Sequence, residues 1–276
     1  MKCQRGTDMR DEPKRPDSST HAKAAARLTP EEVELGRKQA ELREMQSALA
    51  DRELELANLR GELVAFERRY IHEVGHLYAQ LDGLEAQIAD AIFLRKPRDD
   101  SARKNAENAR TRAQESAQAV DDVGPDTSNR PFEPSERLGK LYREAARRLH
   151  PDLTTDPKEK ARRQKVMAEI NRAYEECDEE RIRQILDDWR VSPDQVEGED
   201  TAAELVRAIR TIALVQKRLA AITKEIADLG RSELSQLKSQ VEEAAAAGRD
   251  LLSEMAGRVN DQIDEAKTSL ESLLSK

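Results

Sequence analysis

Two histidines four residues apart give the chain its most recognisable arrangement of chemically active side chains. His72, Glu73 and His76 occur in the stretch YIHEVGHLYAQLD and fit the pattern H-E-x-x-H. On a helix, histidines at this spacing lie on the same side and can share a zinc ion, while the glutamate activates a bound water for peptide hydrolysis. The first hypothesis is therefore a zinc peptidase.

The surroundings of this motif argue against a peptidase. A catalytic zinc needs a third protein ligand and a dry cleft. The helix predicted around the motif continues through Leu81, which leaves Asp82 about 15 Å along the axis from His72 at a rise of about 1.5 Å per residue. The other histidines, His21 and His150, lie in unrelated segments. We favour the alternative that the match is due to chance and that both histidines face solvent.

The composition indicates an all-helical protein. Charged residues make up 37% of the chain and aromatic residues only 3%, which suits long helices with a narrow apolar seam better than a thick mixed core. Runs of alternating β-branched residues between turn signals, the usual sign of strands, are hard to find.

The cysteines and the apolar runs bear on the cellular compartment. Cys3 and Cys177 lie in unrelated contexts, so the sequence offers neither a disulfide framework nor a thiolate metal site. No apolar run approaches the length of about 20 residues that spans a bilayer, and the N-terminus lacks the apolar centre of a signal peptide. We therefore expect a cytoplasmic protein without a cofactor and without a membrane partner.

A heptad repeat dominates the first third of the chain. A helix should begin at Thr29-Pro30, which supplies an N-cap and a proline in the first turn. Apolar residues then recur at every seventh position: Leu35, Leu42, Leu49, Leu56, Leu63, Tyr70, Leu77 and Leu84. Near Tyr70 two successive steps of four residues form a stutter, which locally unwinds a coiled coil. The partner of this helix is either a second copy or another segment of the chain.

A second heptad lies in the C-terminal quarter. Its apolar positions are Leu205, Ala208, Ile212, Val215, Leu219, Ile222, Ile226 and Leu229. Gly230 is a suitable stop, and a further amphipathic helix is predicted from Ser232 to Leu274, so this region is expected to form a helical hairpin or coiled coil. The whole chain then divides into a disordered tail (1–28), a coiled-coil helix (29–95), a polar linker that is helical in part (96–134), a compact region (135–190), a linker (191–200) and the C-terminal helices (201–276).

The compact region contains a basic island within a chain of net charge −8. Between Arg137 and Lys165 there are ten Lys and Arg residues against four Asp and Glu. The pattern predicts two amphipathic helices joined by a short loop, packed as an antiparallel hairpin with Asp156 as the N-cap of the second helix. Its predicted core comprises Leu138, Leu141, Tyr142, Ala145, Leu149, Ile170, Ala173 and Tyr174. Four cations lie mostly outside this stripe: Lys140, Arg143, Arg147 and Arg148.

The loop between these helices contains His150, Pro151 and Asp152, and with its flanks it resembles the J domain of DnaJ-type co-chaperones. In that family helices II and III flank an H-P-D loop. Tyr142, eight residues before His150, occupies the place of the tyrosine in the family's AYR segment, and AEINRAY (168–174) is similar to the family's EINEAY. The resemblance covers about residues 135–178, with a fourth helix expected from Glu179 to Trp189.

This resemblance implies an interaction module and not an enzyme. J domains bind a DnaK-type chaperone and stimulate its ATP hydrolysis. His150, Pro151 and Asp152 would carry that signal, and Lys140, Arg143, Arg147 and Arg148 would dock on an acidic surface of the partner, where complementary charge speeds and orients the encounter. Nucleic acid is a weaker candidate because no aromatic side chains that could stack on bases are interleaved with the cations.

The chain departs from the family in two respects. Helix I of a J domain is not visible, because only linker precedes Pro134; either a remote helix, such as part of the coiled coil, covers the hairpin or the domain is reduced. The Gly/Phe-rich, CxxC and β-rich client-binding segments of full DnaJ proteins are absent, so the client is unknown. The leading hypothesis is a co-chaperone whose coiled coils oligomerise it or tether it to a client or assembly. The alternative is a coiled-coil scaffold or adaptor with a purely architectural J-like hairpin, and the zinc peptidase is a remote third.

Overall fold

The protein is all-helical in the computed structural model, which describes residues 29–123, 131–190 and 201–275. The tail and linker predicted at 1–28 and 191–200 lie outside the described residues. No strand occurs in the described ranges, and no helix in them is long and apolar enough to cross a membrane. The elements in chain order are α1 (Pro30–Tyr70), η1 (Ile71–Gly75), α2 (His76–Arg95), α3 (Asp100–Val123), α4 (Glu136–Leu149), η2 (Pro151–Leu153), α5 (Pro157–Glu175), α6 (Glu179–Arg190), α7 (Thr201–Gly230), α8 (Glu233–Ala246) and α9 (Leu251–Leu274).

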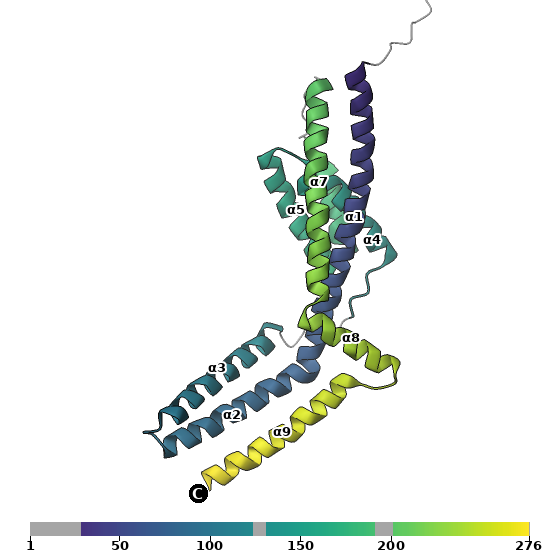
Figure 1. Ribbon diagram of the computed structural model, residues 1–276. Coiled ribbons are helices and arrows are strands. Elements are labelled where there is room, and N and C mark those ends of the chain that lie inside the picture. The colour runs from purple at the N-terminus through teal and green to yellow at the C-terminus, as the bar shows by residue number, and fades with distance from the viewer. Residues whose placement is uncertain (1–28, 124–130, 191–200, 276) are drawn as a thin grey trace, which may run out of the picture.

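The first three elements form one continuous but bent helix. It begins with the predicted cap, since the Thr29 hydroxyl accepts from the Glu32 N–H and the Glu32 carboxylate accepts from the Thr29 N–H. At the heptad stutter the chain forms the π-helix η1, which fits an extra residue into one turn. Figure 1 shows that the helix changes direction there, so α1 and α2 belong to two different arms of the molecule.

The upper arm pairs α1 with α7 of the same chain, and the two helices run parallel (Figure 1). Two ion pairs fix this direction, because Glu53 contacts Arg218 and Arg60 contacts Glu225, each pair 165 residues apart. The seam between the helices buries leucine, isoleucine and valine side chains from both heptads: Leu49, Leu56, Val215 and Ile222, with Leu42, Met45, Leu219, Ile226 and Leu229 half-buried beside them. The two heptad helices therefore pair with each other within one chain.

A small unit of α4, α5 and α6 packs against the other side of α1. Its core contains apolar side chains from all three helices, and α1 adds Ala50, Leu54 and Ala57 to it. The helix predicted from Glu179 to Trp189 is present as α6, and Asp156 caps α5 as expected. The apolar side of the α4–α5 hairpin is thus covered by α1, which comes from a remote part of the sequence.

The lower arm is built around α2, with α3 on one side and α9 on the other (Figure 1). Helix α3 runs antiparallel to α2, because Arg110 pairs with Asp90 while Ser116, further along α3, bonds to Asp82. Helix α9 runs parallel to α2, with its buried Val259 and Ile263 beside Leu81. The part of the 96–134 linker that was expected to be helical is α3, and what the sequence did not indicate is its packing, since its small side chains Ala102, Ala106 and Ala109 are buried.

The predicted C-terminal hairpin requires correction. Helix α7 ends at Gly230 as expected, but it packs mainly on α1 and not on the helices that follow it. The helix expected from Ser232 to Leu274 is interrupted between α8 and α9, where Gly248 has a positive φ of 76°. Helix α7 packs on the apolar stripe of α1, and α9 packs on the apolar stripe of α2. The C-terminal helices therefore have separate partners and do not form a hairpin with each other.

Candidate functional site

The HPD loop, meaning His150, Pro151 and Asp152, leaves the C-terminal end of α4 as a short 3₁₀ turn. His150 has extended backbone angles (φ −60°, ψ 132°) and ends the helix. Pro151 then starts η2, where its fixed φ and missing N–H fit a first helical position. The Asp152 N–H donates to His150 Nδ1 at 3.0 Å, and the Leu153 N–H donates to the His150 carbonyl at 3.1 Å. The loop therefore holds one conformation through its own hydrogen bonds.

His150 is buried, with only 3% of its surface exposed. Its Nε2 lies 2.8 Å from Oε1 of Glu53 on α1. Because Nδ1 accepts a hydrogen bond from the backbone, the ring hydrogen must lie on Nε2, which donates it to the carboxylate. The side chain that the sequence places at an exposed recognition loop is thus fixed inside the protein.

Glu53 is itself buried and joins the loop to α7. Arg218 donates from Nε to Glu53 Oε1 at 2.7 Å and from a terminal nitrogen to Oε2 at 3.0 Å. Such a two-point, charge-assisted pair is among the stronger hydrogen-bonding arrangements in proteins. We call His150, Glu53 and Arg218 the Glu53 network. It connects three elements that lie far apart in the sequence.

The Glu53 network should make the stability of the protein depend on pH. Burial alone would raise the pKa of the Glu53 carboxyl, but the hydrogen bonds from His150 and Arg218 outweigh burial and place this pKa below its ordinary value of 4.5. A carboxyl with a lowered pKa in the folded state stabilises the fold fully at neutral pH and loses this contribution as the pH falls below the unfolded-state value and through the lowered pKa. We expect the free energy of unfolding, measured by urea titration, to fall less steeply over this acidic range in Glu53→Gln than in the wild type. Equal slopes would contradict this expectation.

The rest of the loop is also engaged within the chain. The Asp152 carboxylate pairs with the Lys160 ammonium of α5 at 2.7 Å, and its side chain is less than one-fifth exposed. Leu153 packs into the apolar seam between α1 and α7. Each side of the loop is therefore in contact with a different helix.

The four cations of α4, which we call the basic face, differ in their exposure and in their ion pairs. Lys140 and Arg148 are exposed and pair along their own helix with Glu136 and Glu144. Arg143 instead pairs with Asp51 of α1 at 2.9 Å and is only partly exposed. Arg147 is exposed and forms no ion pair with the residues that the structure describes. Three of the four cations can therefore meet a partner directly.

The predicted core residues of the hairpin gather in one cluster with α1. Tyr142 and Tyr174 are almost fully buried, with ring centroids 4.7 Å apart. Their hydroxyls reach Asn171 and Asn58 at 2.8 and 2.6 Å, and burial raises the pKa of Tyr174 to about 12. The other buried members are Leu138, Ala145, Leu149, Ile170 and Ala173, while Leu141 is partly buried beside them.

The H-E-x-x-H motif lies at the bend, on η1 and the first residue of α2. His72 and His76 are exposed, and the Glu73 carboxylate pairs with Arg69 at 2.8 Å. Within the described ranges, no three His, Cys, Asp or Glu side chains gather closely enough to hold a metal ion. The geometry around the motif gives a peptidase mechanism no support.

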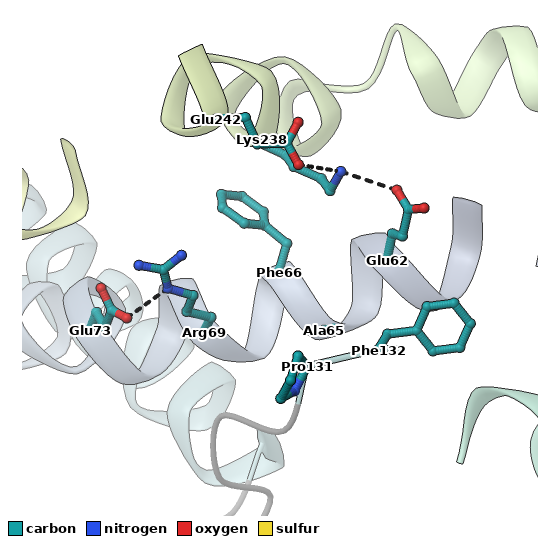
Figure 2. A pocket seen from close by; sticks show the side chains of 9 residues that line it. All are labelled: Glu62, Ala65, Phe66, Arg69, Glu73, Pro131, Phe132, Lys238 and Glu242. Carbon is teal, nitrogen blue, oxygen red and sulfur yellow. Dashed lines mark hydrogen bonds and ion pairs between the residues drawn. The ribbon is translucent and has the colours of Figure 1, made fainter. Parts of the chain in front are cut away.

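A groove of about 610 Å³ lies between α1, α8 and the segment before α4. Figure 2 shows Phe66 and Lys238 directed into this space, with Lys238 held between the carboxylates of Glu62 and Glu242. Its lining residues are Glu62, Ala65, Phe66, Arg69, Glu73, Pro131, Phe132, Lys238 and Glu242. Both cations in the groove are already paired, and no residue of the HPD loop or the basic face lines it.

Sequence reasoning missed Glu53 and Arg218, although a signal for them exists. Glu53 and Arg60 are seven residues apart on α1, and Arg218 and Glu225 are seven apart on α7 with the opposite order of charges. Charges that flank a heptad seam in this complementary way select a partner and its direction. Comparing the two heptads with each other would have indicated the parallel pairing.

The fold and the site define an all-helical protein in which a small three-helix unit packs on a pair of parallel helices, α1 and α7, of the same chain. Comparisons with protein families, with curated proteins and with solved structures found no match. Function must therefore be inferred from the chain itself.

Proposed function

We propose that this protein is a J-domain-like co-chaperone that binds a DnaK-type chaperone and stimulates its ATPase. The observation that carries the proposal is the α4–α5 hairpin, whose HPD loop is held in a defined turn and whose apolar side is covered by α1. A J-domain-like hairpin needs a helix that covers its apolar side, and the sequence directly before Pro134 does not supply one. The hairpin therefore has a complete core from which to present its loop and basic face.

The charge distribution supports the same partner. Lys140, Arg147 and Arg148 project from one exposed helix face of a chain whose net charge is −8. A localised cationic face on an acidic protein favours encounter with an acidic surface in one orientation. The two arms, in each of which helices of the same chain pack together, would set the position of a client or assembly relative to the recruited chaperone.

A scaffold or adaptor is the second candidate, and the burial of His150 favours it. A loop whose histidine is 3% exposed and bonded to Glu53 can serve as an internal joint between α4, α1 and α7 without any partner. In that case the hairpin would only brace the coiled coil.

An ATPase assay with a DnaK-type chaperone separates the two candidates. The variant Asp152→Asn alters the more accessible loop side chain and leaves the Glu53 network in place. A co-chaperone should stimulate ATP hydrolysis, and Asp152→Asn should reduce the stimulation by about tenfold or more, equivalent to about 1.4 kcal/mol. Arg147→Glu should weaken it as well, whereas Lys165→Glu, the same charge change on the exposed side of α5, should not.

The assay should include Arg218→Glu, because Arg218 is the α7 residue that closes the network over His150. If neither the wild-type chain nor Arg218→Glu gives stimulation that depends on Asp152, the co-chaperone proposal is wrong and the scaffold is favoured.

A further inference from the structure

We infer that α7 is a removable cover, whose pairing with α1 closes the HPD loop and whose release opens it. This inference rests on the proposed function and concerns the regulation of the same loop. Two contacts carry it. Arg218 of α7 binds the carboxylate that holds His150, and Leu153, which directly follows Asp152, packs into the seam between α7 and α1.

The packing indicates which of the two helices, α1 or α7, can separate without exposing the core of the α4–α6 unit. Helix α1 contributes Ala50, Leu54 and Ala57 to the core of the α4–α6 unit, so its removal would expose that core. Helix α7 contributes no buried residue to this core and is held by a separate seam around Val215 and Ile222. The α7 pairing can therefore open while the hairpin keeps its core and its covering helix.

The chemistry of the α7 seam suits a contact that opens and closes. Most of α7 is exposed, including Val206 and Ile209, each 46% exposed, because only one side of the helix meets the rest of the protein. Its ion pairs with α1 are those of Arg218 with the buried Glu53 and of Glu225 with the partly exposed Arg60, and water can replace the interactions of the exposed partners once the helices separate. When α7 leaves, Glu53 loses its pair with Arg218 and Leu153 loses the apolar seam, so the α7 side of the turn at residues 151–153 is uncovered and the hold of Glu53 on His150 is weakened.

The loop in the closed form offers little to a partner. His150 is buried and α7 packs against the turn at residues 151–153, so the closed form presents the basic face outside the loop. Closed chains would meet the chaperone without transmitting the signal. A ligand or assembly that captures α7 would then switch the co-chaperone on.

The experiment compares locked and released forms of the full-length chain. Arg60 and Glu225 are in direct contact across the seam, so Arg60→Cys with Glu225→Cys, in a chain with Cys3→Ser and Cys177→Ser, allows a short bismaleimide to lock α7 onto α1. Arg218→Glu is the released form, because it places a second carboxylate against Glu53. Lys217→Glu, an equal charge change on the exposed side of the same helix, is its matched control.

The readout is stimulation of the ATPase of a DnaK-type chaperone, each time with and without Asp152→Asn. Hydrogen exchange should show α7 deprotected in Arg218→Glu while α4 and α5 stay protected, which separates release from unfolding. We expect Arg218→Glu to stimulate at least about tenfold more than the wild type, Lys217→Glu to match the wild type, and cross-linking to lower stimulation below that of the uncross-linked chain.

Two results would overturn the inference in distinguishable ways. If stimulation depends on Asp152 but is the same in the locked and uncross-linked chains, the inference that α7 closes the loop is wrong and the co-chaperone proposal stands. If no form gives stimulation that depends on Asp152, the co-chaperone proposal is wrong, and so is the inference that α7 regulates it.

Discussion

Replacing Glu53 with alanine is expected to lower the free energy of unfolding by about 3 kcal/mol, because removing one partner of a buried charge network leaves the others without compensation. The His150 ring would lose its acceptor at 2.8 Å, and Arg218 would lose both of its short contacts. Arg218 is more than one-quarter exposed, so water can recover part of the loss on that side. Urea denaturation followed by circular dichroism measures the change directly.

Glu55→Ala is the matched control for this prediction. Glu55 lies two residues further along α1 and pairs with Arg52 at 2.6 Å, but both side chains are about half exposed. Exposed pairs of this kind contribute about 0 to 1 kcal/mol, so the control should change little. A double-mutant cycle with Arg218→Ala then isolates the pairwise energy, which should be favourable for Glu53 and near zero for Glu55. Equal losses in the two alanine variants would show that Glu53 is not a structural joint.

Several helix beginnings and ends could be predicted because they depend on neighbouring residues. Thr29 and Asp156 cap α1 and α5 as the sequence indicates, and Gly230 is the last residue of α7. The stutter near Tyr70 likewise indicated where the coiled coil would be distorted, and the π-helix lies at that place. These features follow from local backbone chemistry and heptad spacing alone.

The pairing of the helices was not predicted, because the apolar stripes alone do not specify it and the complementary charges beside them were not compared. A heptad stripe specifies that a helix needs an apolar partner, but many stripes satisfy that need equally well. The C-terminal stripe was therefore expected to fold back on itself, whereas α7 pairs with α1. Helix α3 was missed as a packed element because it lacks a stripe of large apolar residues and buries alanines such as Ala106, which sequence patterns do not distinguish from an exposed helix.

The HPD loop was located correctly, but its burial was not foreseen. The residues that cover it lie 97 positions away, at Glu53, and further along the chain in α7. Both Glu53 and Arg218 are charged, and charged residues beside a seam are normally solvated, so nothing local identified them as a buried pair. The exposure of a recognition loop thus depends on tertiary pairing that the loop sequence does not encode.

Leu54→Asp is expected to separate the α4–α6 unit from α1 and to destabilise that unit by at least about 4 kcal/mol, because it places an unpaired carboxylate in an apolar core. Leu54 is only 6% exposed and lies in the cluster that contains Tyr142 and Leu149. Trp189 packs against the same cluster and is the only tryptophan in the chain, so its fluorescence reports on this unit. The unfolding midpoint by fluorescence should fall well below that of the wild type.

Leu94→Asp provides the control, since Leu94 is 76% exposed at the end of α2 and a carboxylate there stays in water. Leu54→Ala should fall between the two variants, with a loss of about 2 to 4 kcal/mol for a buried leucine truncated to alanine. The order matters for function, because α1 is the only described helix outside α4–α6 that contributes buried residues to the core of the unit. If Leu54→Asp left the Trp189 transition unchanged, the hairpin would be stable without α1, and α1 could not be the helix that completes a J-domain-like unit.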